Sequence, residues 1–288
     1  MMLSKKGLHI AVPSKGRLMD ASVDLLQRSG LKFRVSGRRL FSECSDCDVR
    51  IIFSNVADIP LLVSEGVVDL GITGSDNVEE QGAEVITHQE LGFGRCRLSV
   101  AVHKDSGYQK PTDLNGKVVG SKFVALTQKF LDEHEVQNAS IIPIQGAVEV
   151  MVLLGMVDAI VEIVETGNSL VENDLVEVEH ILDAQAVLLG NGHPRDPSEA
   201  ERVLRRVQGV LHAAEYSLLE YNCPAERVAE AAAVTPGFSA PTVQAMSDPA
   251  WSAIKVLVPK TEVPSAMDRL EALGCIAILE TALRNTRL

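Results

Sequence analysis

The stretch Asp158-Ala-Ile-Val-Glu-Ile-Val-Glu-Thr-Gly-Asn-Ser-Leu170 predicts a buried strand that ends in acidic residues and runs into a tight turn. A turn that opens a helix presents free backbone N–H groups and the positive end of the helix dipole. Thr166 and Ser169 add hydroxyl groups, and Gly167 lets the backbone approach a ligand closely. Carboxylates beside a phosphate-binding turn suit phosphoribosyl recognition.

Phosphoribosyl pyrophosphate has the two features that this pattern fits. Its ribose diol requires hydrogen-bond acceptors such as carboxylates, and its 5′-phosphate requires N–H donors. The competing interpretation is an ordinary strand-to-helix connection that Thr166 or Ser169 caps. The turn taken alone does not separate the two interpretations.

Other segments favour the ligand-binding interpretation. Read with Glu149 and Gly155, the strand and turn up to Leu170 resemble the signature of the ATP phosphoribosyltransferase family, which catalyses the first step of histidine biosynthesis. Further segments that fit this family follow in its order along nearly the whole chain: Ala11-Val-Pro-Ser-Lys-Gly-Arg-Leu18, Asp58-Ile-Pro60, Gly66-Val-Val-Asp-Leu-Gly-Ile-Thr-Gly74, Leu91-Gly-Phe-Gly-Arg-Cys-Arg-Leu98, Gln145-Gly-Ala-Val-Glu149 and Thr235-Pro-Gly-Phe-Ser-Ala-Pro-Thr242.

Composition permits this resemblance without requiring it. The 288 residues are 46% hydrophobic, which is enough for several cores and therefore several domains. No apolar run reaches membrane-spanning length, and the first ten residues lead into a strand without a signal-peptide core. The expectation is a cytoplasmic protein that does not bind membranes. Five scattered cysteines suit reduced thiols, and Cys44-Ser-Asp-Cys47 has no second pair that would complete a zinc site.

The net charge of −12 argues against nucleic-acid binding, because a phosphate backbone attracts a basic surface. The same charge repels ATP and phosphoribosyl pyrophosphate, so both would need Mg²⁺, backbone N–H groups and local cations. The candidate cations are Lys15, Arg17, Arg95 and Arg97. For each of them, a solvated surface position is the alternative.

The first half of the chain alternates short apolar runs with amphipathic segments, as parallel α/β domains do. A strand near residues 8–12 leads through Lys15-Gly16-Arg17 into a helix, and ligands bind at such strand ends. A second unit places Thr73-Gly74-Ser-Asp76 at the end of the strand over residues 68–72. A plain glycine turn capped by Asp76 is the alternative there, and only the resemblance favours binding.

A further set of strands is expected over residues 98–102, 117–120, 141–144 and 159–164, with helices from Leu126 and Ala147 between them. A strand over residues 184–189 then returns to the first set. By resemblance the catalytic core has two lobes like a periplasmic binding protein, with lobe I from residues 1–96 and 188–210 and lobe II from residues 97–187.

From residue 211 the expected order is strand, helix, strand, strand, helix, strand, which is the ferredoxin-like plan. In the long form of the family, an ACT-like domain of this kind binds histidine, the end product of the pathway. The resemblance places that ligand near Asn222, Phe238, Thr242 and Ala277. The alternative is a dimerisation module without a ligand.

The resemblance implies that adenine N1 of ATP attacks the anomeric carbon of phosphoribosyl pyrophosphate and expels pyrophosphate, with Mg²⁺ held mainly by the substrate phosphates. Glu162 would bind the ribose diol with Asp158 beside it, residues 166–170 including Asn168 and Leu170 would bind the 5′-phosphate, and Glu149 would support that pocket. ATP would contact Lys15, Gly16, Arg17, Thr73, Gly74 and Asp76. Similar long-form enzymes are homo-oligomers, from dimers to hexamers, and are inhibited by histidine.

The chain also departs from the family pattern. It has Glu162 where Asp is usual, Ser169 where Thr is usual, and the uncharged run Ser54-Asn-Val-Ala57 where basic residues are usual. Glu165 and Val157 each replace a small residue. Weaker substrate binding, a compensating cation elsewhere and a catalytically silent paralogue all remain open, as does a small-molecule-binding module with the same two-lobed fold.

Overall fold

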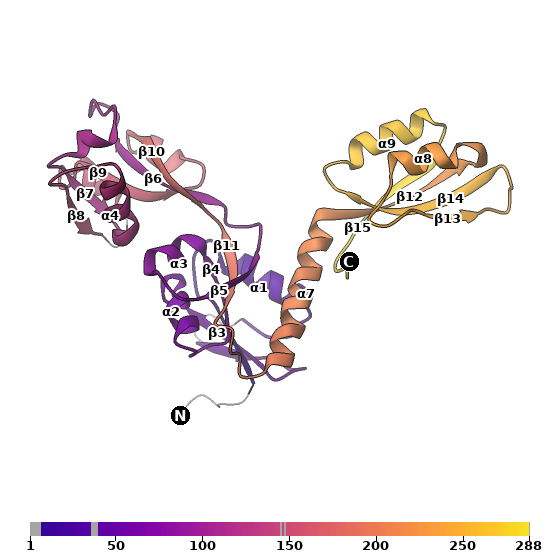
Figure 1. The fold of residues 1–288 in the computed structure, drawn as a ribbon, viewed down its shortest axis with the longest axis horizontal. Coiled ribbons are helices and arrows are strands. Elements are labelled where there is room, and N and C mark those ends of the chain that lie inside the picture. The colour runs from indigo at the N-terminus through magenta and orange to yellow at the C-terminus, as the bar shows by residue number, and fades with distance from the viewer. Residues whose placement is uncertain (1–6, 36–39, 145, 147, 288) are drawn as a thin grey trace. The chain divides into compact units, whose positions relative to one another are not determined.

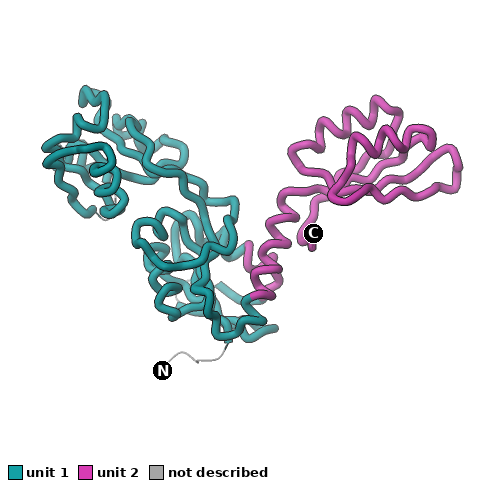
Figure 2. Tube along the Cα trace, viewed as in Figure 1, with its two compact units in different colours: residues 1–24, 32–200 teal, residues 25–31, 201–288 magenta. Residues whose placement is uncertain are grey.

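The computed structural model describes residues 7–35, 40–144, 146 and 148–287. The chain divides into two compact units (Figure 2). Unit 1 comprises Met1–Asp24 and Lys32–Ala200, and unit 2 comprises Leu25–Leu31 and Glu201–Leu288. No helix within the described ranges is long and apolar enough to cross a membrane.

One part of unit 1 is built on a six-stranded sheet with the order β2-β3-β1-β4-β11-β5 (Figure 1). Its strands are β1 Leu8–Pro13, β2 Phe41–Glu43, β3 Val49–Ser54, β4 Leu70–Gly74, β5 Ile86–Glu90 and β11 Ala186–Gly190. The helices connected to it are α1 Met19–Arg28, η1 Val56–Asp58, α2 Ile59–Ser64 and α3 Ser75–Gln81. All six residues of β1 are buried, as expected for a central strand with both faces covered.

The register of this sheet positions one edge of the site. Strand β1 pairs in parallel with β3 and β4, and Pro13 lies opposite Ser54. The three strands therefore end at the same edge of the sheet, where parallel sheets place ligands. The segments that follow them carry Lys15, Asn55 and Asp76, and Asp76 lies in the first turn of α3.

The other part of unit 1 has a five-stranded sheet with the order β10-β6-β9-β7-β8. Its strands are β6 Cys96–His103, β7 Val118–Ser121, β8 Ser140–Pro143, β9 Ala159–Val164 and β10 Leu175–Ala184. The connected helices are η2 Pro111–Leu114, α4 Val124–Glu133, α5 Glu149–Leu153 and α6 Asn168–Glu172. Successive β9 side chains pack in two separate cores, Val161 in one and Ile160 in the other, so this sheet is also covered on both faces.

Several expected elements differ from those observed. Both sheets are mixed, because β6 runs antiparallel to β9 and β10, and β11 runs antiparallel to β4 and β5. Strands β2, β5 and β10 were not predicted. Strand β10 reads Leu-Val-Glu-Val-Glu-His-Ile-Leu-Asp-Ala, whose many acidic residues hid an edge strand of partly exposed side chains. The predicted helix start at Ala147 lies outside the described residues, and α5 begins at Glu149.

Unit 2 contains α7 Pro197–Glu215, whose first residues lie in unit 1, and a four-stranded sheet. The strand expected from residue 211 begins only at Tyr216, because Val203, Val207, Val210 and Ala213 continue one buried face of α7 at helical spacing. The domain that follows is β12 Tyr216–Pro224, η3 Ala225–Arg227, α8 Val228–Val234, β13 Thr242–Ala245, β14 Trp251–Pro259, α9 Val263–Ala272 and β15 Ile276–Ala282. Its antiparallel order β13-β14-β12-β15 confirms the predicted ferredoxin-like plan.

Candidate active site

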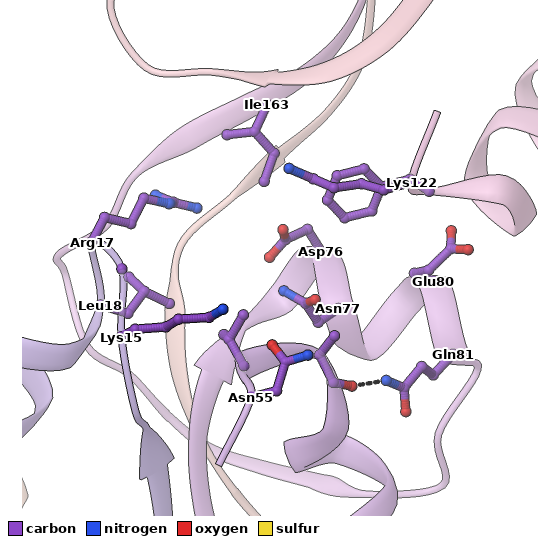
Figure 3. Close-up of a pocket in the computed structure, with 14 residues that line it drawn as sticks. Lys15, Arg17, Leu18, Asn55, Asp76, Asn77, Glu80, Gln81, Lys122 and Ile163 are labelled. Atoms are coloured by element: carbon purple, nitrogen blue, oxygen red, sulfur yellow. Dashed lines mark hydrogen bonds between the residues drawn. The ribbon is translucent and has the colours of Figure 1, made fainter. Parts of the chain in front are cut away.

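A pocket of about 340 Å³ lies within unit 1, where the segments after β1, β3 and β7 meet helix α3 (Figure 3). Four of the six residues predicted to contact ATP, namely Lys15, Gly16, Arg17 and Asp76, line it. The remaining lining residues are Leu18, Asn55, Val56, Ala57, Asn77, Glu80, Gln81, Lys122, Phe123 and Ile163. We refer to this cavity as the first pocket.

Arg17 is held in place at the rim of the first pocket. Its Nη1 donates to the Gly94 carbonyl at 2.6 Å and its Nη2 to Cys96 Sγ at 3.0 Å. Its Nε lies 3.3 Å from Glu165 Oε1. No ion pair to Lys15 is present among the described residues. The loop thus provides one fixed cation and one cation whose ammonium is available.

Asp76 is a buried carboxylate at the wall of the first pocket. It is 1% exposed in the first turn of α3, and neither oxygen has a hydrogen-bond partner within the described structure. Burial raises the pKa of Asp76, and the nearby Arg17 charge opposes this shift. A side chain at Gly74 would collide with Asp76 Oδ1. Gly74 therefore leaves room for the carboxylate instead of lining the pocket.

Thr73 also has a structural position. It is fully buried, and its Oγ1 donates to the Val56 carbonyl at 2.8 Å. This bond ties the end of β4 to η1, the segment that contributes Val56 and Ala57 to the pocket wall. Thr73 and Gly74 thus shape the first pocket from behind.

A second pocket of about 400 Å³ lies beside the turn after β9. Six predicted residues line it, namely Glu149, Glu162, Thr166, Gly167, Ser169 and Leu170, whereas Asn168 does not. Ser169 Oγ donates to Glu149 Oε1 at 2.6 Å. Gly167 has φ +83°, the left-handed conformation that glycine adopts without strain, and it precedes the first residue of α6. Arg17, Lys122 and Ile163 line both pockets.

Glu162 pairs with a lysine that sequence reasoning missed. Lys122 Nζ lies 2.8 Å from Glu162 Oε1, and the Ile163 amide donates to the same oxygen at 2.8 Å. The pair forms because β7 and β9 are parallel with Ser121 opposite Val161. The Ser121 hydroxyl donates to the Val161 carbonyl at 3.0 Å and accepts from the Phe123 amide at 2.9 Å, which fixes the turn. A strand followed by a helix was visible in the sequence here, but the register was not.

The structure does not bring Asp158 to this site. Asp158 precedes β9, whereas Glu162 is near its carboxyl end, so the two side chains lie at opposite ends of the strand. Asp158 accepts hydrogen bonds from the Val118 amide at 2.9 Å and from Lys117 Nζ at 3.1 Å. The Val118 bond is the main cause that lowers the pKa of Asp158. We therefore remove Asp158 from the candidate catalytic residues.

The other candidate cations lie outside both pockets. Arg97 binds Glu177 with both Nε and Nη2, and these bonds lower the pKa of Glu177. Arg95 lines a separate cavity beside Glu79 and Glu90. Among the unusual residues, Asn55 and Ala57 line the first pocket and Glu165 lines the second, whereas Val157 is buried in the core beside Ile144.

The residues predicted to bind histidine do not form one cluster within unit 2. Phe238 packs edge-on against Tyr216, with 6.5 Å between the ring centroids, at the first residue of β12. Asn222 lies six residues farther along this strand, about 20 Å at the rise of an extended chain. Ala277, with φ +50°, lies near Asn222 at the register shift between β12 and β15. Thr242 is opposite Lys255 on β14.

No group of three or more His, Cys, Asp or Glu side chains in the described ranges could hold a metal ion. The acids of the second pocket already have partners: Glu149 binds Ser169, Glu162 binds Lys122 and Glu165 binds Arg17. The protein groups therefore do not fit a resident Mg²⁺ site. A metal ion that arrives with a substrate phosphate would not need one.

Comparison with known proteins places these pockets in a family context. A family model described as ATP phosphoribosyltransferase matches residues 55–209, and one described as HisG, C-terminal domain, matches residues 213–285. An ATP phosphoribosyltransferase from Rhodopirellula baltica is 42% identical over 281 residues, which cover 98% of this chain and 94% of that protein. One from Candida glabrata is 35% identical over 295 residues, covering 97% and 96%.

Solved structures agree with this match. The ATP phosphoribosyl transferase (HisG:HisZ) complex from Thermotoga maritima contains a chain that is 27% identical, with a TM-score of 0.63 over 72% of this chain and 98% of that one. A substrate binding protein of an amino acid ABC transporter shares only the fold, at 13% identity and a TM-score of 0.50 over 73% of this chain and 95% of that one. The predicted two-lobed α/β fold is confirmed.

Proposed function

Because the chain belongs to the ATP phosphoribosyltransferase family, we propose that it condenses ATP with phosphoribosyl pyrophosphate, giving N1-(5-phosphoribosyl)-ATP and pyrophosphate in the first step of histidine biosynthesis. The observation that carries this proposal is the pair of pockets that share Arg17, Lys122 and Ile163. Substrates bound in adjoining pockets meet at the shared residues, which is the arrangement that a two-substrate transfer requires.

Phosphoribosyl pyrophosphate occupies the second pocket in this proposal. Its 5′-phosphate binds the turn of residues 166–170, whose N–H groups and Thr166 hydroxyl are suitable donors. Its ribose diol donates to Glu162, which pairs with Lys122 in the structure. Glu149 holds the Ser169 hydroxyl and so keeps the phosphate turn in shape.

ATP occupies the first pocket. Lys15 and Arg17, at the carboxyl end of β1, lie where they would contact its phosphates. Asp76 lies between Arg17 and Lys122 in Figure 3, and its carboxylate provides a hydrogen-bond acceptor in the pocket wall. The first pocket thus combines the cations Lys15, Arg17 and Lys122 with a buried carboxylate.

Positioning and electrostatics supply the catalysis. The C1–O bond to pyrophosphate breaks with its electron pair on the leaving oxygen, while the N1 lone pair of adenine forms the new C1–N1 bond. Positive charge develops on the sugar and negative charge on pyrophosphate. Fixed carboxylates near the ribose and fixed cations near the leaving group stabilise this separation, and a single such interaction contributes about 10²–10³ in rate.

Mg²⁺ enters bound to pyrophosphate oxygens rather than to a protein site in this proposal, since the acids of the second pocket already have partners. The expectation is a requirement for Mg²⁺ in turnover. Binding of ribose 5-phosphate, which lacks the pyrophosphate, should then not depend on Mg²⁺.

The regulatory part of the proposal concerns unit 2. Its ferredoxin-like domain would bind histidine through Asn222, Phe238, Thr242 and Ala277, and histidine would inhibit turnover. Because Phe238 and Asn222 lie at opposite ends of β12, these four residues suit a site completed by another copy of the chain in a dimer or hexamer. We also propose that the enzyme works in the cytoplasm, where ATP and phosphoribosyl pyrophosphate are present.

The test is product formation. Purified protein is mixed with ATP, phosphoribosyl pyrophosphate and Mg²⁺, with and without L-histidine, and phosphoribosyl-ATP is followed by its ultraviolet absorbance. Product that decreases as histidine is added supports both the catalytic and the regulatory proposals. Folded protein that yields no product would contradict the catalytic proposal and favour a silent paralogue.

A further inference from the structure

Lys122 lies at the junction of the two pockets. It follows β7 directly and lines the first pocket with Asp76 (Figure 3). It also lines the second pocket with Glu162 and Thr166. A group at this junction faces the region where the two substrates would meet.

The Lys122–Glu162 pair has one fixed and one movable partner. The Glu162 side chain is 13% exposed, and the Ile163 amide also donates to its Oε1 at 2.8 Å. The Lys122 side chain is 38% exposed, and its Nζ lies 5.4 Å from the centroid of the Phe123 ring. The ammonium can therefore leave while the carboxylate stays.

The charges around the junction show why this ammonium is needed. Asn55 and Ala57, which line the first pocket, carry no charge. Arg17 is committed to Gly94, Cys96 and Glu165. Two cations line both pockets in the described part of the chain, Arg17 and Lys122. Lys122 is the one that becomes free when its bond to Glu162 alone is replaced.

We propose that Lys122 binds the departing pyrophosphate, and that the ribose diol releases it from Glu162; this inference rests on the proposed function. When the two hydroxyls donate to Glu162, they replace the ammonium as hydrogen-bond donors. Lys122 then turns to the oxygen that receives the electron pair of the breaking C1–O bond. Lys122, which pairs with Glu162 in the free enzyme, then stabilises the negative charge that develops on pyrophosphate.

The experiment compares Lys122→Met with Lys117→Met. Lys117 is a matched control, because it precedes the same strand and pairs with Asp158 at 3.1 Å at the opposite end of β9. Binding of Mg²⁺–pyrophosphate is measured by calorimetry, and kcat and KM are measured with both substrates. Lys122→Met should weaken pyrophosphate binding about 10- to 100-fold and lower kcat, while the KM for ATP changes much less. Lys117→Met should leave all of these values unchanged.

Two further measurements make the result decisive. Lys122→Arg retains the cation and should recover most of the pyrophosphate affinity, which a purely structural role of lysine does not predict. Lys122→Gln replaces Lys122→Met if the methionine variant does not fold. If the Lys122 and Lys117 variants bind pyrophosphate equally well, the role proposed for Lys122 is wrong. The proposed function would still stand in that case, provided that the wild-type protein turns over. Absence of wild-type turnover would instead refute the proposed function.

Discussion

The Glu165 carboxylate lies 3.3 Å from the Arg17 guanidinium, so the residue before the phosphate turn is joined to the loop after β1. The Glu165 side chain is 50% exposed and that of Arg17 is 30% exposed. Screening by water makes such a pair worth about 0.2–1 kcal/mol. The unusual acid therefore has two opposing effects, since it orients a useful cation and also repels an incoming phosphate.

The first prediction concerns this balance. Glu165→Gln should lower the KM for phosphoribosyl pyrophosphate about two- to fivefold, because it removes a negative charge next to the phosphate turn while Gly94 and Cys96 still hold Arg17. Steady-state kinetics at low ionic strength measure the change. Glu172→Gln, on the exposed side of α6, has the same change in net charge and should have no effect. A higher KM in Glu165→Gln would show that orientation of Arg17 dominates.

The second prediction separates the two acids of β9. Glu162→Gln should lower kcat/KM for phosphoribosyl pyrophosphate about 100-fold, because an amide is a weaker acceptor for the diol and does not offset positive charge on the sugar. Asp158→Asn should leave kcat/KM unchanged, because Asp158 contacts Val118 and Lys117 at the other end of the strand. Similar losses in both variants would mean that Glu162 acts through folding, and thermal unfolding of each variant tests that directly.

The contrast between these acids shows what the sequence can and cannot predict. The sequence allowed Glu149, Thr166 and Ser169 to be placed at one site. Thr166 and Ser169 are close in the chain, and Glu149 belongs to the same motif. Lys122 was not, because its approach to Glu162 depends on which residues of β7 and β9 face each other. Asp158 was placed wrongly for a different reason. Its spacing from Glu162 predicts that both side chains point to the same face of the sheet, but it does not bring them to the same end of the strand. Strand β10 was missed because edge strands tolerate the polar residues that sequence patterns assign to loops.

The third prediction concerns Gly74 and Asp76. Gly74 has an ordinary negative φ of −81°, so the cost of Gly74→Ala comes from the clash with Asp76 Oδ1 and not from backbone strain. We expect Gly74→Ala to destabilise the protein by about 1–3 kcal/mol and to raise the KM for ATP. In the double variant Gly74→Ala/Asp76→Ala the loss of stability should be smaller than the sum of the single losses. Chemical denaturation of the four proteins completes the cycle, and strict additivity would refute the clash.

The fourth prediction is a pH dependence of stability. His9 on β1 is 3% exposed, and neither ring nitrogen has a hydrogen-bond partner in the described part of the chain. Burial, followed by the Arg195 charge, lowers the pKa of His9 below 6.5, although Asp69 opposes this and Arg50 adds to it. As the pH falls through 6.5, His9 therefore binds a proton more readily in the unfolded chain than in the folded chain. The free energy of unfolding should decrease as pH falls through 6.5 and below.

His9→Phe provides the comparison for this pH dependence, because it removes the titrating group and keeps a buried ring. Urea denaturation between pH 5 and pH 8 should give a shallower pH slope for His9→Phe than for the wild type. Lys104→Met, which removes an exposed charge paired with Asp174, is the control for a general charge effect. Identical slopes in His9→Phe and wild type would assign the acid sensitivity to other groups.

The last prediction concerns histidine inhibition, and the length of α7 decides where the chain should be shortened. A deletion after Val210 would cut α7, which extends to Glu215 and buries Val203, Val207 and Ala213. Ending the chain at Glu215 keeps α7 and removes only the ferredoxin-like domain.

If that domain is the histidine sensor, the shortened protein should lose inhibition by histidine. Undiminished inhibition would place the inhibitor in the pockets of unit 1. Since loss of assembly can also change turnover, sedimentation of both proteins with and without histidine shows whether the domain senses the ligand, holds copies together, or does both.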